Sequence, residues 1–258
     1  MSQAKAQWFI AAAVEPEIQG IRDVVHGQPE LSARKGRAWS GEWRGNPLLL
    51  VRTGVGPAKA REGLAAILEV HRCRGIVSTG YAGGLREGYR LGDILVPAEV
   101  QSIPPLPEVR LRPDPQLRDA VLEAARSGPW HVHTSRMITT NRVIASTAEK
   151  RRLGRAYDAG SVEMESAALA ELAASRSVPF VAIRVVLDEA SFSLPDHLEV
   201  LGWWQKRQFA KLARFVALHP QRFVELLKLR QRSRRASERL TDLFRGYVLD
   251  GLQEVRTV

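Results

Sequence analysis

The chain has 258 residues, 45% hydrophobic and 26% charged, which is typical of a globular protein and excludes a largely disordered one. Apolar runs too short for a membrane span, first residues without the apolar core of a secretory signal and a single cysteine, Cys73, indicate a cytoplasmic protein. The close histidine pair, His131 and His133, has no cysteine or carboxylate nearby in the sequence, so we expect no metal site.

The net charge of +10 belongs mainly to one segment. Residues 206–245 hold twelve Lys or Arg and three Asp or Glu, a net charge of +9, whereas residues 1–205 are almost neutral. A nucleic-acid-binding function would require this segment to act as a binding arm. We therefore expect no specific nucleic-acid partner for the main body of the protein.

The predicted elements alternate between short apolar strands and amphipathic helices. Strands are predicted at residues 8–14, 47–54, 75–80, 91–97, 130–138 and 178–188. Helices are predicted just after Pro16, from about residue 58 to 70, and at 117–125 and 161–175. Residues 105–115 are predicted to be a proline-rich surface loop, and the chain beyond about Pro195 to be helical. This order indicates an α/β fold with a sheet covered on both faces.

Several predicted strands end in residues that suit a ligand site, and ligands bind at strand ends in such folds. The first strand leads into Glu17, the second into the turn Gly54-Val-Gly56, and the third into Tyr81-Ala-Gly-Gly84. The strand at 178–188 carries Arg184 and ends at Asp188. A charge inside such an apolar strand requires a partner.

The segment SVEMES (161–166) places Glu163 and Glu165 two residues apart at the entry to a helix. Two carboxylates this close repel each other unless each has its own cationic or hydroxyl partner. Structural explanations exist for the single features. Glu165 could simply favour the helix N-terminus, Asp188 could cap a following helix, and Glu17 could be a solvated first-turn carboxylate.

Together, these motifs resemble the purine nucleoside phosphorylase and nucleosidase family, especially its methylthioadenosine/S-adenosylhomocysteine nucleosidases. The segments that carry the resemblance are TGVGPAKA (53–60), STGYAGGLREGYRLGDILVP (78–97), SVEMESAALAELA (161–173) and VPFVAIRVVLDEA (178–190). The spacing between V-E-M-E and the Asp of R-x-x-x-D is its most specific part. The resemblance implies cleavage of the bond between a purine base and ribose, a homo-oligomer, and no cofactor beyond water or phosphate.

The fold that the resemblance implies is a three-layer α/β/α sandwich around a mixed, partly barrel-like sheet. We expect it to form a catalytic domain at residues 1–195, with a helical, basic C-terminal extension at residues 196–258. Two rival interpretations are a nucleoside sensor without catalytic activity and a protein that binds nucleic acid through the basic segment.

The resemblance also assigns roles to residues. Asp188 would donate or share a proton at N7 of the leaving base, and Glu17 would activate the attacking water. Glu165 would bind the ribose hydroxyls, with Met164 packed beneath the sugar. Oxocarbenium-like cleavage needs such an acid at the leaving group and negative charge or a nucleophile near the sugar. The other positions expected to contact substrate are Glu163, Val143 beside the base, Arg184 near the nucleophile, Tyr81, Ala82 and Gly83.

One departure concerns the nucleophile. Tyr81 stands where many relatives have a serine that helps to hold phosphate or water. The AAAV run before Glu15 also lacks the glycine and arginine pattern of the phosphate-binding hexameric phosphorylases. Hydrolysis is therefore favoured over phosphorolysis, and attack by phosphate stays open.

The sequence after Asp188 resembles the C-terminal extension of hopanoid-associated phosphorylases, which implies adenosylhopane as substrate. An apolar stripe is expected at Trp203, Trp204, Phe209, Leu212, Phe215 and Val216, beside the cations Lys206, Arg207, Lys211 and Arg214. A basic amphipathic helix of this kind can lie on an anionic membrane, at the inner membrane surface for a cytoplasmic protein. The alternative is that the stripe packs on the body or at a subunit interface.

Overall fold

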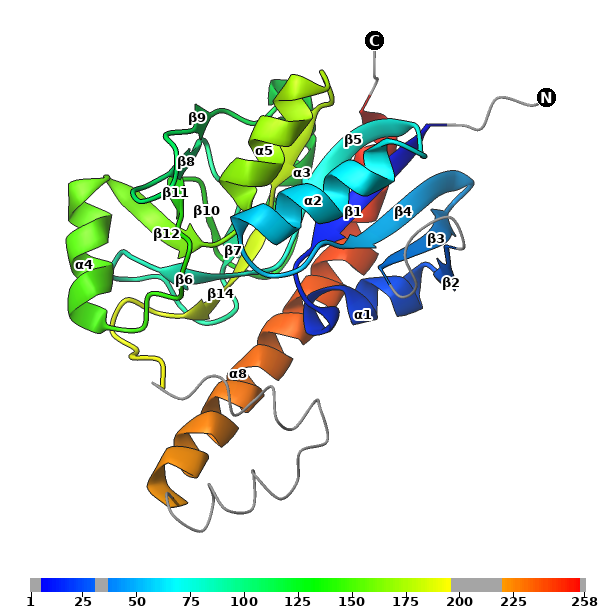
Figure 1. Ribbon diagram of the computed structural model, residues 1–258. Coiled ribbons are helices and arrows are strands. Elements are labelled where there is room, and N and C mark those ends of the chain that lie inside the picture. Colours follow the sequence, from blue (N-terminus) through cyan, green and yellow to red (C-terminus); the bar gives the residue numbers. More distant parts are fainter. Residues whose placement is uncertain (1–5, 31–36, 196–219, 256–258) are drawn as a thin grey trace.

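The computed structural model describes residues 6–30, 37–195 and 220–255. Two mixed β-sheets lie at its centre (Figure 1). The first has six strands within the described residues, and β1 lies between β5 and β4, parallel to both. Their order is β13 (Phe180–Ala182), β5 (Cys73–Ser78), β1 (Gln7–Ala12), β4 (Asn46–Arg52), β3 (Ala38–Trp43) and β2 (Gln28–Pro29).

The second sheet has eight short strands within the described residues. Its central strand β6 is parallel to β14 on one side and antiparallel to β12 on the other, so the sheet is mixed. Their order is β10 (Val132–His133), β7 (Ile94–Leu95), β14 (Arg184–Asp188), β6 (Tyr81–Gly84), β12 (Ala159–Glu163), β11 (Arg136–Thr139), β8 (Val100–Ser102) and β9 (Arg110–Leu111).

Two neighbouring segments of the chain pass from the first sheet into the second. The segment 73–84 forms β5 and then β6, and the segment 180–188 forms β13 and then β14. The two segments are parallel and paired on both sides of the crossing. The predictions of a single strand at 178–188 and of a closing turn at Tyr81-Ala-Gly-Gly84 were therefore wrong, because each segment changes sheets midway.

Helices cover both faces of the first sheet. Successive side chains of β1 point to opposite faces, so they pack against two different groups of helices. Phe9 and Ala11 pack on the side of α2 and α5, and Trp8 and Ile10 pack on the side of α1, α3, α8 and α9. The helices are α1 (Glu15–Val24), α2 (Pro57–Leu68), α3 (Pro115–Arg126), α4 (Thr147–Ala156), α5 (Ser166–Ser175), α8 (Pro220–Leu243) and α9 (Leu249–Glu254), with a π-helical turn at Phe244–Val248. This arrangement confirms the three-layer α/β/α fold.

The C-terminal part of α8 belongs to the core. Leu240, Leu243 and Phe244 are buried in the same cluster as Trp8. Where α8 crosses α1, a Cβ added at Gly20 would lie 1.8 Å from Thr241 Oγ1, so the close approach requires glycine there. The expected stripe at residues 203–216 lies outside the described residues.

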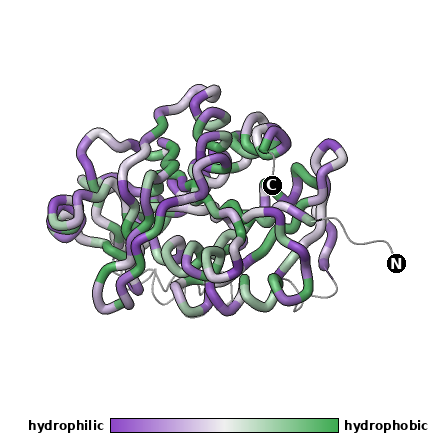
Figure 2. Tube along the Cα trace, turned by 90° about the horizontal axis from the view of Figure 1, so that it is seen from above, coloured by the Kyte–Doolittle hydropathy of each residue, from purple (hydrophilic) through white to green (hydrophobic). Residues whose placement is uncertain are grey.

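Smaller differences from the predicted elements occur in the second sheet. The predicted helix 161–175 begins only at Ser166, because residues 159–163 form β12. The predicted strand 130–138 is divided into β10 and β11, and the predicted loop 105–115 contains β9. The outlying helix α4 is largely hydrophilic (Figure 2). Among the described residues, no helix is both long and apolar enough to cross a bilayer.

Candidate active site

A cavity of about 220 Å³ lies at the junction of the two sheets, beside the ends of β1, β6, β12 and β14. Nine of the ten site residues predicted from the sequence line this cavity; Arg184 does not. They are Glu17, Tyr81, Ala82, Gly83, Val143, Glu163, Met164, Glu165 and Asp188. The strand ends thus bring together side chains that are more than 170 positions apart in the sequence.

Glu17 lies in the first turn of α1 and is 8% exposed, so it is not a solvated carboxylate. Its carboxylate accepts hydrogen bonds from the backbone N–H groups of Ala13 (2.9 Å), Val14 (3.1 Å) and Tyr81 (3.0 Å). A Cβ at Gly80 would come within 2.7 Å of Glu17 Oε1, so glycine leaves the space that this carboxylate fills. Burial raises the pKa of Glu17, and the charge of Arg184 and the backbone donors oppose the rise.

Glu163 and Arg184 form a buried ion pair, 3.0 Å from Oε2 to Nη2. Glu163 also accepts hydrogen bonds from the hydroxyl of Thr139 and from the backbone N–H groups of Glu165 and Ser166. It thus satisfies backbone donors that the N-terminus of α5 leaves unpaired. This carboxylate therefore has the partners that its spacing from Glu165 requires.

Arg184 is turned away from the cavity. Its guanidinium donates to Ser78 O (2.7 Å), Ile183 O (3.0 Å), Ser78 Oγ (2.9 Å) and Ser166 Oγ (2.8 Å), in addition to Glu163. A charge inside an apolar strand is tolerated here because it is paired and hydrogen-bonded. Arg184 thus holds Glu163 and the crossing between the sheets, and its charge acts on Glu17. Its expected place near the nucleophile stays a prediction.

Glu165 occupies the N-cap position of α5, yet its side chain makes no capping hydrogen bond. Its Oε1 instead accepts the N–H of Gly56 at 2.8 Å. Gly56 has φ +91°, a conformation that favours glycine, so the GVG turn presents its backbone to this carboxylate. Burial, followed by the nearby charge of Glu163, raises the pKa of Glu165 to about 8.

Asp188 ends β14 and is 3% exposed. Its Oδ2 receives a hydrogen bond from the ammonium of Lys150 on α4, which is fully buried and also donates to Glu189 O (3.1 Å) and Phe192 O (2.7 Å). Burial raises the pKa of Asp188, and the Lys150 cation opposes the rise. A turn follows Asp188 in the structure, so it does not cap a helix there.

Sequence reasoning missed Lys150. It lies in the charged run EKRR, whose other members are exposed or paired at the surface, and its spacing carries no sign of its different role. Gly83 was predicted as a site residue. It leaves space for the Asp188 carboxylate, since a Cβ at Gly83 would lie 3.1 Å from Asp188 Oδ2. Four carboxylates therefore line the cavity: Glu163 is paired with Arg184, and each of the other three has a different kind of partner.

The sequence matches the model of the family described as Phosphorylase superfamily over residues 9–217, about four fifths of the chain. The chain belongs to the phosphorylase superfamily. Curated relatives in this superfamily include the 5′-methylthioadenosine/S-adenosylhomocysteine nucleosidases of Halalkalibacterium halodurans (24% identical, covering 74% of this chain and 90% of the relative) and Haemophilus ducreyi (25%, covering 70% and 84%).

Solved structures of the superfamily share the fold. A nucleosidase of the same name from Neisseria meningitidis, in complex with methylthio-immucillin-A, has a TM-score of 0.68 at 21% identity and covers 93% of this chain and 99% of that one. A futalosine hydrolase mutant from Helicobacter pylori has a TM-score of 0.63 at 17% identity, with 70% and 89% covered. The first structure spans nearly the whole chain, including regions beyond the first 195 residues.

Tyr81, for which the sequence resemblance predicts a serine in relatives, has its hydroxyl directed toward α8. The hydroxyl is hydrogen-bonded to Ser237 Oγ, and Pro16 O lies within hydrogen-bond distance of both hydroxyls, 3.2 Å from that of Tyr81 and 2.8 Å from that of Ser237. Burial raises the pKa of Tyr81 to about 12. Tyr81 also lines the cavity, and its backbone N–H donates to the Glu17 carboxylate. Through Ser237, α8 therefore contacts both Tyr81 and Pro16, the residue that precedes Glu17.

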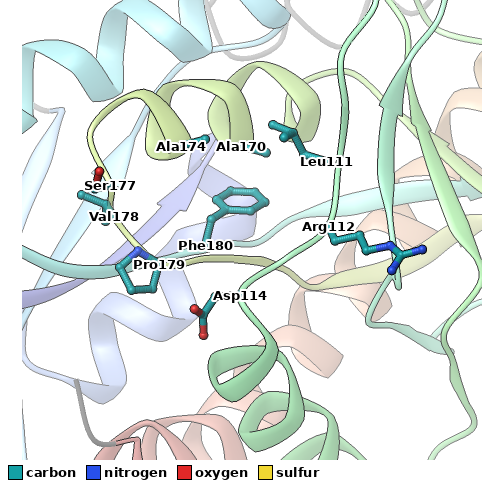
Figure 3. Close-up of a pocket in the computed structure, with 9 residues that line it drawn as sticks. All are labelled: Leu111, Arg112, Asp114, Ala170, Ala174, Ser177, Val178, Pro179 and Phe180. Carbon is teal, nitrogen blue, oxygen red and sulfur yellow. The ribbon is translucent and has the colours of Figure 1, made fainter. Parts of the chain in front are cut away.

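A second pocket, of about 270 Å³, opens between α5, β13 and the start of α3 (Figure 3). The ring of Phe180 lies at its centre. Its one carboxylate, Asp114, already accepts the N–H of Leu117 as the N-cap of α3. This pocket therefore lacks the group of carboxylates that lines the first cavity. Within the described residues, no group of His, Cys, Asp and Glu is placed to hold a metal ion.

Proposed function

We propose that the protein cleaves the N-glycosidic bond of a purine nucleoside, a 5′-modified adenosine, by attack of water at the anomeric carbon. The observation that carries this proposal is that, besides Glu163 with its Arg184 partner, three carboxylates line one cavity with different partners: backbone donors for Glu17, the Gly56 turn for Glu165, and an ammonium for Asp188. Curated relatives named as nucleosidases, and a related structure from Borrelia burgdorferi with adenine bound, support the choice of base.

Asp188 is the acid in this proposal. Burial raises its pKa and so favours the protonated form over that of an ordinary carboxyl, and Lys150 occupies Oδ2, which leaves Oδ1 to deliver a proton to N7 of the base. As the bond to ribose breaks, the base accepts the bonding electrons and the proton. The carboxylate left behind is stabilised by the Lys150 cation, so the proton transfer does not create an unpaired buried charge.

Glu17 is the base. Its raised pKa brings it closer to the range of an effective proton acceptor, and three backbone N–H groups hold the carboxylate in one orientation. It takes a proton from water as the water oxygen bonds to the anomeric carbon. Glu165 binds the ribose hydroxyls. Met164, which lies between Glu163 and Glu165 in the sequence, packs against the sugar.

Two contacts favour water over phosphate. The backbone N–H groups of Ala13, Val14 and Tyr81 could have formed an anion site, but the Glu17 carboxylate occupies them. Arg184 is committed to Glu163 and to carbonyl and hydroxyl oxygens. A phosphate entering this region would meet a carboxylate instead of a free cation.

The direct test is incubation of the purified protein with a panel of adenosine derivatives that differ at the 5′ position, with and without phosphate. We expect release of free adenine in both conditions, with ribose derivatives and no ribose 1-phosphates as the sugar product. Binding of a nucleoside without base release would identify a sensor in place of an enzyme. A salt-dependent mobility shift of random duplex DNA would instead support the nucleic-acid function.

A peripheral contact with an anionic membrane is a further part of the proposal, as is a lipid-linked nucleoside such as adenosylhopane. The N-terminal half of α8 extends beyond the sheets (Figure 1), exposes Val224 and Leu227, and carries Lys228 and Arg230. Binding to anionic but not neutral liposomes, weakened by salt, tests this contact. Light scattering tests the proposed homo-oligomer, and cell fractionation the cytoplasmic location.

A further inference from the structure

The backbone at Asp188 departs from regular strand pairing. In β14, Val186 pairs with Ala82 and Asp188 pairs with Gly83, so Leu187 is an extra residue without a partner in β6. A bulge of this kind redirects the side chain beside it and leaves a backbone group without a ladder hydrogen bond. The sheet alone therefore does not fix the orientation of Asp188.

Arg232 of α8 supplies the missing contacts. Its Nε donates to the carbonyl of Leu187 at 3.0 Å, and its Nη2 forms an ion pair with the carboxylate of Glu189. The same Glu189 carboxylate accepts the N–H of Leu91 at 3.1 Å, and the guanidinium lies 4.2 Å from the centre of the Phe192 ring. One planar group thus binds the residues immediately before and after Asp188.

We propose that Arg232 is a positioning residue for Asp188: by binding both neighbours across the bulge, it holds the acid in the orientation in which it meets the base. The proposal rests on the proposed function, which makes Asp188 the acid. Lys150 holds the carboxylate from α4, and Arg232 holds its backbone from α8. A lysine at 232 keeps the charge but cannot reproduce the fork of two directed donors.

The charged groups around Asp188 also give Arg232 an electrostatic signature. Burial raises the pKa of Asp188, Lys150 and then Arg232 lower it, and Glu189 raises it. Replacing Arg232 by glutamine removes one cation and leaves Glu189 without its partner. Both changes raise the pKa of Asp188, so the high-pH limb of activity, where the acid loses its proton, moves to higher pH.

The experiment compares Arg232→Gln and Arg232→Lys with Arg234→Gln as the matched control. Arg234 lies on the same helix, is exposed, and pairs only with Glu238 in the described residues. Each substitution is made in the wild-type and in the Asp188→Asn background. The readouts are kcat, KM and the pH profile with the best nucleoside of the panel, and amide hydrogen exchange of residues 187–192.

We expect Arg232→Gln to lower kcat about tenfold or more, as misplacement of a catalytic group does, with KM within about twofold. Arg232→Lys should lower kcat by less without moving the high-pH limb, and Arg234→Gln should match the wild type. In the Asp188→Asn background the loss from Arg232→Gln should disappear, because a residue that acts through Asp188 has no further effect once the acid is gone.

Unchanged kcat in Arg232→Gln, or an equal loss in both backgrounds, overturns the proposal. Full activity of Asp188→Asn alone contradicts the proposed function instead. Hydrogen exchange does not depend on activity: faster exchange confined to residues 187–192 supports positioning, and unchanged exchange there contradicts it. If Arg232→Gln does not fold, Glu189→Gln breaks the same ion pair from the other side and should lower kcat in the same way. Its high-pH limb should move to lower pH, because a negative charge beside Asp188 is removed.

Discussion

Glu17 and Asp188 are both buried carboxylates with raised pKa values, and the two regions that hold them use opposite means. Around Glu17 the donors are backbone N–H groups from the end of β1 and the start of β6. Around Asp188 the main donor is the ammonium of a single side chain, Lys150. Backbone donors orient a base without a full counter-charge, whereas an ammonium stabilises the anion that an acid becomes. The difference matches the two roles and predicts different responses to mutation.

The largest effect is expected from Lys150→Met, which leaves a buried carboxylate without its cation. Breaking a buried ion pair from one side costs about 3–5 kcal/mol, so we expect a loss of this size in the free energy of unfolding at pH 8. Denaturant unfolding measures it. The loss should shrink at low pH, where Asp188 is protonated, and should be partly restored by Lys150→Met combined with Asp188→Asn. A pH-independent loss would mean that the side chain contributes by packing alone.

Asp188→Asn tests the acid directly. Loss of general acid catalysis lowers kcat roughly a hundredfold or more. Steady-state release of adenine measures this. The amide keeps the size of the side chain, so the fold should be retained, and circular dichroism provides that control. Near-normal turnover would remove Asp188 from the mechanism and with it the contrast to Glu17.

Glu165→Gln separates the ribose-binding carboxylate from the other two. We expect a loss on the order of 2 kcal/mol in kcat/KM, because a charge-assisted hydrogen bond is replaced by a neutral one. A 2′-deoxy substrate should show a much smaller loss if the carboxylate binds that hydroxyl. Equal losses on the two substrates would contradict this role.

The same variant should change how stability depends on pH. Glu165 has a folded-state pKa of about 8, above its ordinary value of 4.5, so the folded protein binds its proton more tightly than the unfolded chain does. The stability from this proton is present below pH 4.5 and is lost as pH rises through about 8. Between these pH values, the midpoint temperature of thermal unfolding should therefore fall less with rising pH in Glu165→Gln than in the wild type.

Gly80→Ala is expected to have the smallest effect, and it is the counterpart of Lys150→Met on the Glu17 side. The donors to Glu17 are backbone N–H groups, which no single side-chain substitution removes. Gly80→Ala instead perturbs the site by displacing the Glu17 carboxylate. The added Cβ would meet Glu17 Oε1 at 2.7 Å, on a residue with φ +146°. We expect kcat to fall about tenfold from the displaced base, with KM little changed. The same fall with Gly88→Ala, whose Cβ would meet nothing within 4 Å at φ +92°, would point to backbone strain instead.

The sequence predicted the layers of the fold because alternation of apolar strands and helices reports burial on both faces. It did not predict the sheet crossings, since the residues on both sides of Ile183 are buried and burial is the same in either sheet. The start of α5 was misplaced for a related reason: the residues of β12 are all buried, and a short buried strand has no periodicity to distinguish it from a buried helix.

Most residues of the candidate site could be predicted because strand ends meet in such folds and the spacing of the motifs is specific. What spacing could not give is the direction of each side chain. Arg184 points into the protein toward Glu163, and the Tyr81 hydroxyl points toward Ser237. Lys150 and Arg232 lie in runs of basic residues, and only tertiary packing separates them from their solvated neighbours.

The burial of Trp8 and Ile10 against α8 and α9 has a consequence for the order of events on the ribosome. One face of the central strand is covered by residues 236–255 in addition to α1 and α3, so part of that face stays uncovered until more than 220 further residues have been synthesised. Pairing of such distant segments is slow, because the closure of the intervening loop precedes the contacts that reward it. The nascent chain therefore carries an incomplete hydrophobic core through most of its synthesis, and docking of α8 and α9 is the step that completes it.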